Sequence, residues 1–136
     1  MPDGSNLTIQ GTFTVALGLG TADISGNTLA NSIVGNSGNN TLDGGAAADV
    51  LTGNAGNDTF VFHRGQGNGD TIVDFAGNGA AAGDSLQLVG YGSMATFTNI
   101  DATHWQVNFF TPMGPAHEVI TFMNGASIDP TDYSFI

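Results

Sequence analysis

Aspartate side chains recur at a fixed place in a glycine-rich repeat, a pattern suited to binding a hard cation. Three consecutive segments, residues 35–43, 44–52 and 53–61, follow the template Gly-Gly-x-Gly-x-Asp-x-U-x, where U is a large apolar residue. Asp49 and Asp58 fill the sixth position of the second and third segments. Calcium takes roughly 6–8 oxygen ligands, and a glycine-rich turn exposes its backbone carbonyls at little steric cost. Carboxylates and carbonyls at this spacing therefore suit a hard cation such as calcium.

The repeat length predicts which turns share an ion. Two nonapeptides make one coil, so turns eighteen residues apart lie on the same edge and clamp an ion between them. Counting pairs Asn31 with Asp49 and Asn40 with Asp58. Asp49 also pairs with Asp70, at a separation of 21 residues that includes a three-residue insertion. This last pair is the one unambiguous site with two carboxylates.

Other positions of the candidate sites stay open at this stage. Asp58 takes its second acid from Asp74 or Asp84, and the irregular spacing there favours neither. Asparagine offers a neutral oxygen, so for the sites with one Asn two alternatives stay open: calcium occupies them, or they are weakly occupied or empty. The candidate ligands are side chains and turn carbonyls: Asn31, Asn40, Asp49, Asp58, Asp70, Asp74 and Asp84, with Gly35, Gly38, Gly44, Ala46, Gly53, Ala55 and Gly56.

A solenoid of short parallel strands is expected to position these turns. One large apolar residue recurs at every ninth place, and the pattern resumes after the insertion at residues 62–64: Val15, Ile24, Ile33, Leu42, Leu51, Phe60, Ile72 and Leu86. Each is predicted to point inward, so that every rung covers the apolar face of its neighbour. Residues 65–73 and 79–87 fit the same register, and Asp74 and Phe75 are expected to extend a strand.

The repeats also predict local conformation. Asn36 and Asn54 stand at the second template position, where a left-handed backbone is expected and Asn tolerates it. Ala22, at an early sixth position, indicates a turn that keeps the shape of the repeat and loses its charge. Asp23 and Asp43 fall at outward strand positions and are expected to be solvated.

From Tyr91 onward the apolar pattern changes to period two, which predicts antiparallel strands. Strands are expected at residues 95–100, 104–110 and 117–122, joined by turns at 99–103 and 111–116. One face should carry Trp105, Val107 and Phe109, and Asp129 should cap a short helical turn that begins with Pro130. The class is all-β, with one domain over residues 1–136 made of a roll (8–88) and a capping region (91–136).

Composition limits the partners and the chemistry. Twelve acidic residues face one basic residue, Arg64, and the net charge is −11. Such a surface repels phosphate backbones and anionic membranes, which argues against nucleic-acid and membrane binding. No cysteine is present, and no apolar run reaches membrane-spanning length. The excess of negative charge therefore favours a cation as the partner.

Catalytic motifs are not found in the sequence. It contains no Gly-x-Ser-x-Gly, and its glycine-rich runs lead into strands rather than helices, so neither a hydrolase nucleophile nor a nucleotide cradle is supported. His63, His104 and His117 are scattered, and His117 and Glu118 point to opposite faces of one strand, which argues against a transition-metal site. We therefore expect a non-enzymatic, monomeric module.

Residues 26–88 resemble the RTX, or hemolysin-type calcium-binding, family, and residues 51–62 followed by 70–75 look like the final repeats of such domains. The resemblance implies a right-handed parallel β-roll that binds Ca²⁺. It also implies a secreted, extracellular parent protein, exported by a type I transporter and folded outside the cell. The tail, residues 127–136, is similar to uncleaved C-terminal export signals. The similar R-modules of alginate epimerases suggest polysaccharide as an alternative partner.

Overall fold

The computed structural model describes residues 7–8, 14–16, 21–77 and 83–136. These residues form strands and turns, and no helix in this part of the chain is long and apolar enough to cross a membrane. The strands are β1 (Leu7–Thr8), β2 (Thr14–Ala16), β3 (Ala22–Asn27), β4 (Ser32–Val34), β5 (Asn40–Gly45), β6 (Val50–Thr52), β7 (Thr59–His63), β8 (Thr71–Ile72), β9 (Ser85–Val89), β10 (Thr96–Asn99), β11 (His104–Thr111), β12 (Gly114–Phe122) and β13 (Tyr133–Phe135).

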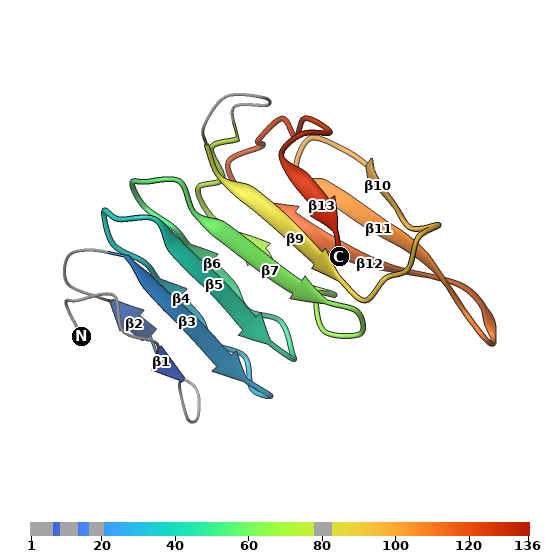
Figure 1. Cartoon of the computed structure of the whole chain (residues 1–136), viewed down its shortest axis with the longest axis horizontal. Coiled ribbons are helices and arrows are strands. Elements are labelled where there is room, and N and C mark those ends of the chain that lie inside the picture. The colour runs from blue at the N-terminus through green and yellow to red at the C-terminus, as the bar shows by residue number, and fades with distance from the viewer. Residues whose placement is uncertain (1–6, 9–13, 17–20, 78–82) are drawn as a thin grey trace.

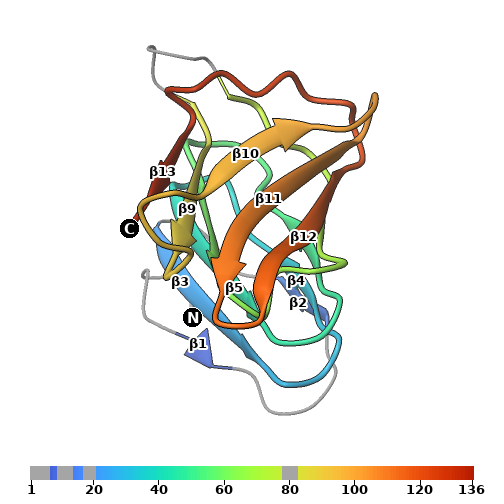
Figure 2. The same ribbon diagram turned by 90° about the vertical axis from the view of Figure 1, so that its right-hand side faces the viewer.

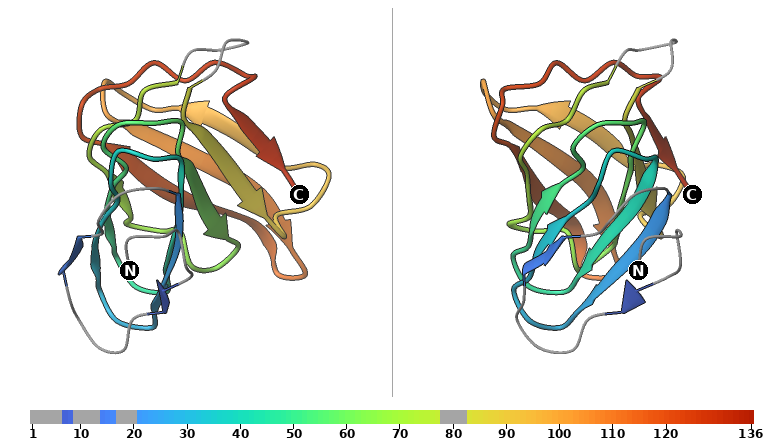
Figure 3. Two further views of the ribbon diagram at one scale, coloured as in Figure 1. Left: turned by 60° about the vertical axis from the view of Figure 1, so that its left-hand side comes forward. Right: turned by 90° about the vertical axis from the view of Figure 1, so that its left-hand side faces the viewer.

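Two sheets form the sides of a flattened coil (Figures 1 and 3). One has the strand order β1-β3-β5-β7-β9-β13, and the other has the order β10-β11-β12-β8-β6-β4-β2. Up to β9 the chain alternates between the sheets, and the pairs from β1 to β9 are parallel. The fold is therefore an all-β parallel β-roll, as the repeat predicts. The turns between successive strands lie along its two edges.

The core of the roll consists of the residues at the eighth repeat position. In one sheet Ile24, Leu42, Phe60 and Leu86 stand in register, and in the other Ile33, Leu51 and Ile72 do. Each of these side chains is at most 1% exposed, which confirms the inward positions expected for them. The backbone of Val15 pairs with Ile33, but its side chain lies outside the described structure, as do residues 79–82 of the last expected repeat.

The expected extension of a strand through Asp74 and Phe75 is wrong. Strand β8 ends at Ile72, and the chain then leaves the sheet. Phe75 is 2% exposed, and its ring lies 6.0 Å from that of Phe60 and 5.4 Å from that of Phe122. Burial of this ring at the end of the core explains why the strand stops early.

The capping region extends the second sheet with three antiparallel strands, which face the viewer in Figure 2. Strands β10, β11 and β12 correspond to the three expected strands. The predicted turn at 111–116 is too long, because Thr111 already pairs with Gly114 and Pro115 lies within β12 opposite Phe110. Strand β8 pairs with β12 only at Thr121 and Phe122, so Pro115 needs no N–H for a second neighbour.

Aromatic side chains pack the interior of the capping region. Val107 and Phe109 are buried and Trp105 packs against the same core, so these three residues share a face as predicted. Strand β13 pairs in parallel with β9, and Tyr133 lies 5.2 Å from Phe97. Before β13, Asp129 accepts the N–H of Thr131 in a turn rather than in a helix.

Candidate calcium sites on the edges of the roll

The sixth-position side chains form one column along each edge of the roll. On one edge Asp49 Oδ1 accepts the N–H of Asn31 at 2.7 Å, and Asp70 Oδ1 accepts the N–H of Asp49 at 2.9 Å. On the other edge Asp58 Oδ1 accepts the N–H of Asn40 at 2.7 Å. The structure thus brings together the three pairs that counting along the sequence predicts.

Asp84 continues the second column, and Asp74 does not. The N–H of Asp58 donates to Asp84 Oδ1 at 2.8 Å, so Asp84 occupies the next in-register place. Asp74 instead accepts the N–H groups of Gly53 and Asn54, at 2.9 and 2.8 Å. Both acids therefore lie near the turn 53–58, but they do so in different ways that the spacing did not distinguish.

Asp49 and Asp58 each bury one carboxylate oxygen that has no hydrogen-bond donor. Their exposed fractions are 1% and 0%, and among the described residues no donor contacts Oδ2 of either side chain. Burial raises the pKa of Asp49 to about 6 and that of Asp58 to about 7. A buried carboxylate in this position is destabilising unless it takes up a proton or a cation.

Asp70 and Asp84 have the same electrostatic character. Burial, with a smaller contribution from the charge of Asp49, raises the pKa of Asp70 to about 7. Burial also raises the pKa of Asp84, and the nearby Asp74 and Asp132 add to this rise. Each column therefore brings carboxylates together, and no basic side chain in the described part of the chain forms an ion pair with them.

The asparagine turns differ from the aspartate turns because they close on themselves. Asn31 Oδ1 accepts the N–H of Asn27 at 3.1 Å, and Asn40 Oδ1 accepts the N–H of Asn36 at 2.8 Å. In both cases the sixth-position side chain satisfies the second-position amide of its own turn. These two turns therefore have an internal acceptor, whereas Oδ2 of Asp49 and of Asp58 contacts no donor among the described residues.

First-position glycines make room for the carboxylates. A Cβ atom on Gly44 would lie 2.3 Å from Asp49 Oδ2, and one on Gly53 would lie 2.3 Å from Asp58 Oδ2. A Cβ atom on Gly35 would likewise lie 2.3 Å from Asn40 Oδ1. A larger residue at these positions would displace the oxygen atoms that converge on the edge.

The remaining candidate positions lie around the same turns. Gly38 O packs against Gly56, Ala46 donates its N–H to Asn27 O, and Ala55 lies exposed in its turn. Their roles as calcium ligands remain predictions.

The backbone conformations of the turns confirm one expectation and contradict another. Asn54 has a φ of 70°, the left-handed conformation expected at the second position. Asn36 is not among the residues with positive φ. Its side-chain oxygen accepts the N–H of Gly38 at 2.8 Å, and this local bond holds a different turn shape.

Asp43 was expected to be a solvated surface residue, but it has a partner on the neighbouring strand. His63 Nε2 lies 3.0 Å from Asp43 Oδ2, and both side chains are partly exposed on the outer face of the sheet. Asp23 is exposed, as expected. The pair lies outside the two columns and is not a metal site.

Glu118 is a buried acid that the sequence interpretation did not assign to a site. It is 4% exposed, and its carboxylate accepts hydrogen bonds from the turn 65–70 and from Tyr91. A signal was available, because Glu118 is the only glutamate and shares its period-two phase with Ile120 and Phe122. That phase places its side chain inward.

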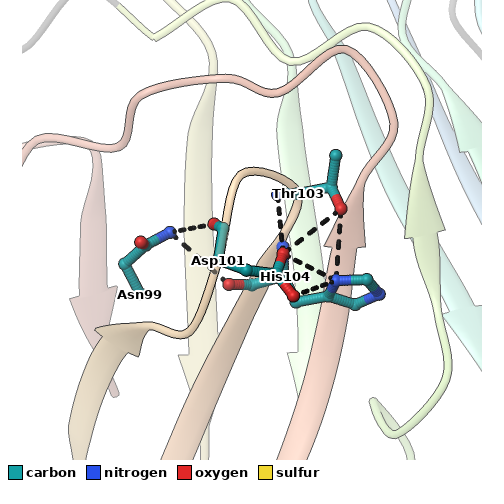
Figure 4. A network of polar contacts seen from close by, with 4 residues as sticks. All are labelled: Asn99, Asp101, Thr103 and His104. Atoms are coloured by element: carbon teal, nitrogen blue, oxygen red, sulfur yellow. Dashed lines mark hydrogen bonds and ion pairs between the residues drawn. The ribbon is translucent and has the colours of Figure 1, made fainter.

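A loop of the capping region shows a carboxylate that needs no ion (Figure 4). Asp101 Oδ1 accepts the N–H groups of Thr103 and His104, both at 2.9 Å, and it also contacts His104 Nδ1 at 2.8 Å. These bonds, that from Thr103 first, lower the pKa of Asp101 to about 2. The cluster is an exposed, self-satisfied turn rather than a cation site.

Comparison with known families agrees with this geometry. Residues 25–60 match the model of the RTX calcium-binding nonapeptide repeat, in four copies. Residues 25–60 of the roll are therefore RTX calcium-binding repeats. Because these repeats bind calcium, Ca²⁺ is the metal of this module. The described residues contain no cluster of three acidic or histidine side chains, but calcium also takes backbone carbonyl oxygens as ligands. No curated protein matches the chain in sequence.

Two solved structures share the fold of the RTX module. The AlgE6R3 subunit of the Azotobacter vinelandii mannuronan C5-epimerase is 22% identical, with a TM-score of 0.57, covering 96% of this chain and 78% of that subunit. The AlgE6R2 subunit of the same enzyme is 21% identical, with a TM-score of 0.52 and coverages of 98% and 91%. At these identities the similarity concerns the fold.

The residues of the aspartate turns fit calcium. Asp49 and Asp58 supply buried oxygens without donors, and Asp70 and Asp84 supply the carboxylates of the following turns. When bound, calcium contributes positive charge that neutralises these groups and joins adjacent turns. The chain itself supplies the crowded, oxygen-lined edges and the glycines that leave room for them.

Proposed function

We propose that this RTX module folds in response to calcium outside the cell, as part of a larger secreted protein. The observation that carries the proposal is the pair of donor-free oxygens on Asp49 and Asp58, in a chain with a net charge of −11. Without a cation, the charges of the two columns oppose compaction of the roll. Because the ion site forms only in the folded roll, the free energy of binding contributes to folding.

Circular dichroism and thermal melts in chelator and in millimolar calcium test this proposal. We expect strand content and the melting temperature to rise with calcium, with a midpoint of about 10⁻⁴ to 10⁻³ M if affinity follows that of other extracellular modules. Magnesium at equal ionic strength is the control, since it demands octahedral geometry and dehydrates reluctantly. Equal melting curves in chelator and calcium would rule the proposal out.

For export, we propose that residues 127–136 carry a type I secretion signal. The support is the resemblance of this tail to such signals together with the calcium dependence above. In the folded chain β13 pairs with β9, so the transporter would have to read the segment before calcium folds it. The alternative role of the same residues is to close the open edge of the sheet.

Deletion of residues 132–136 separates the two roles. If the segment is the signal, a fused reporter stays inside cells that carry the transporter, while the purified deletion variant still folds with calcium. If the segment only closes the sheet, export persists and the melting temperature falls. Tyr133→Ser with Phe135→Ser is a matched variant that weakens strand packing at unchanged chain length.

Polysaccharide binding is the second candidate function. Its support is the fold shared with the epimerase R subunits and an open hollow of about 410 Å³ beside Trp105, lined also by Asn99, Asp101 and Ser127. Against it, Trp105 already stacks on Phe97 at 5.0 Å, and acidic polymers are repelled by this surface. Affinity gels with neutral and acidic polysaccharides, with and without calcium, test the candidate, and Trp105→Phe is the control.

A further inference from the structure

The turn at residues 65–70 matches the repeat in sequence but not in shape. Its positive φ angles fall on the first and fifth positions, Gly65 and Gly69, whereas in the turn 53–58 they fall on the second and fourth. A Cβ atom on Gly53 would collide with the carboxylate of its own turn, but no described atom lies within 4 Å of one placed on Gly65. The turn 65–70 therefore does not wrap around its own sixth-position side chain.

The carboxylate of Glu118 occupies the inside of this turn instead. It accepts the N–H of Gly65 at 2.5 Å and that of Gly67 at 3.1 Å, and the hydroxyl of Tyr91 donates to it at 2.6 Å. A Cβ on Gly67 would lie 3.2 Å from both Glu118 Oε2 and Tyr91 Oη. Three donors thus hold a buried carboxylate, and two of them are amides of the turn itself.

Beyond Glu118, strand β12 stays hydrogen-bonded to the turn 65–70 up to Asp70, which belongs to the column of sixth-position side chains. Gly69 donates its N–H to Val119 O at 2.9 Å, and Thr121 donates its N–H to Asp70 O at 2.9 Å. Asp70 Oδ1 in turn accepts the N–H of Asp49. A continuous path of contacts runs from the capping region to the two-carboxylate site.

We propose that Glu118 is a positioning residue for the Asp49–Asp70 calcium site. Its carboxylate, supplied by the capping region, fixes the turn 65–70 so that Asp70 faces Asp49. The inference rests on the proposed function, because it concerns the calcium that the roll takes up. Calcium binding on this edge then requires the folded cap, while the Asp58–Asp84 column on the other edge has no contact with Glu118 among the hydrogen bonds described.

Calorimetric calcium titration of Glu118→Gln tests the proposal. The substitution keeps the size of the side chain but replaces the carboxylate with a neutral amide. One of the two oxygens that accept hydrogen bonds from Gly65, Gly67 and Tyr91 is then an NH₂ group. We expect one class of site to lose about 10-fold in affinity, the effect typical of outer-shell changes around a metal. Circular dichroism in saturating calcium should show that the variant is folded.

A double-mutant cycle distinguishes positioning from a general loss of stability. If Glu118 acts through Asp70, Glu118→Gln adds little to the loss caused by Asp70→Asn, but its effect adds in full to that of Asp84→Asn. Effects that add in both cycles, or a Glu118→Gln isotherm equal to that of the wild type, overturn the proposal. If Glu118→Gln does not fold, the same cycles are run with Tyr91→Phe, which removes one donor and leaves the carboxylate in place.

The outcome separates this inference from the function on which it rests. A wild-type chain that takes up no calcium contradicts the proposed function as well. A wild type that binds calcium, combined with additive cycles, contradicts only the role of Glu118.

Discussion

The edges of the roll and the capping region treat their carboxylates in opposite ways. On the edges, Asp49 and Asp58 are buried with an oxygen that no described donor contacts. In the cap, exposed Asp101 accepts the N–H groups of Thr103 and His104 in its own loop. Buried Glu118 has three donors, from the turn 65–70 and from Tyr91. These two acids of the cap are satisfied by hydrogen bonds from the protein, whereas Asp49 and Asp58 of the roll each leave one oxygen for an ion to neutralise.

The apolar cores of the roll and of the capping region also differ in the side chains that fill them. Strands β3 to β6 of the roll each contribute one large inward residue, such as Leu42 or Leu51. The cap instead packs aromatic pairs, including Tyr91 with Phe109 at 5.2 Å and Phe97 with Tyr133 at 5.2 Å. Because aromatic pairs bury more area per residue, we expect the cap to depend less on the proposed calcium than the roll does.

The largest predicted effect is that of Asp49→Ala. The substitution removes the carboxylate shared by two neighbouring turn pairs and leaves the N–H of Asn31 without its acceptor. We expect the calcium midpoint for folding to rise at least about 10-fold, since an unmet buried donor alone costs about 1–3 kcal/mol. Calcium-dependent circular dichroism measures the midpoint.

Two variants serve as controls for Asp49→Ala. Asp49→Asn keeps an acceptor for Asn31 and isolates the effect of charge. Asp101→Ala removes an exposed carboxylate of the cap and should leave the calcium midpoint unchanged. Equal shifts for Asp49→Ala and Asp101→Ala would contradict the contrast between roll and cap.

The calcium-free protein should become more stable as the pH falls from about 7.5 to about 5.5. Some carboxyl groups have a higher pKa in the folded chain than in the unfolded chain. Such a group begins to destabilise the fold when the pH rises above its unfolded-state pKa, and the full effect is reached when the pH exceeds its folded-state pKa. For Asp58 and Asp70 this window runs from 3.8 to about 7. A gain of several degrees is expected, since ~1 kcal/mol shifts the melting temperature of a domain this size by about 3–6 °C.

Thermal melts in chelator at each pH measure this dependence. In saturating calcium the slope should be reduced or reversed, because protons then compete with the ion for the same oxygens. A calcium-free melting temperature that falls on acidification would show that these carboxylates are not destabilising in the folded roll.

Asn40→Asp is expected to have a smaller effect of mixed sign. A carboxylate at this position adds a charged oxygen beside Asp58 but removes the bond that Asn40 Nδ2 donates to Asn36 Oδ1. We expect calcium affinity to rise by a few-fold, about 1 kcal/mol or less for an added charge, and calcium-free stability to fall. Paired calorimetry and chelator melts test both signs, and a rise in calcium-free stability would contradict a stabilising role for the bond from Asn40 Nδ2 to Asn36 Oδ1.

His63→Ala is expected to have the smallest effect. The pair of His63 with Asp43 is partly exposed on the outer face, and such pairs contribute about 0–1 kcal/mol. The calcium midpoint should stay the same, because the pair lies outside both columns. A shift comparable to that of Asp49→Ala would mean that outer-face charges also govern calcium binding.

The regular part of the fold could be predicted from the sequence because each rung repeats the same local solution. Leu42, Leu51 and Phe60 are nine residues apart, and that spacing alone places their side chains inward in register. The same counting pairs Asp49 with Asp70 across the insertion. The parts of the site determined by periodicity were therefore accessible without coordinates.

Features that depend on contacts between distant segments were not predictable in this way. The choice between Asp74 and Asp84 depends on where Phe75 finds room in the core. The hydrogen bond from the N–H of Asn36 to Asn40 Oδ1 depends on the orientation of the Asn40 side-chain amide. The role of Glu118 depends on strand β12 returning to a turn about fifty residues earlier, a long-range contact that no local pattern encodes.

Hydrogen exchange followed by mass spectrometry, in calcium and in chelator, tests the dependence of the roll on calcium most directly. Amides of β5, β6 and β7 should be protected in calcium and exchange rapidly in chelator, while amides of β11 and β12 should lose a smaller part of their protection. Equal protection of β5, β6 and β7 in both conditions would contradict the conclusion that calcium completes the roll.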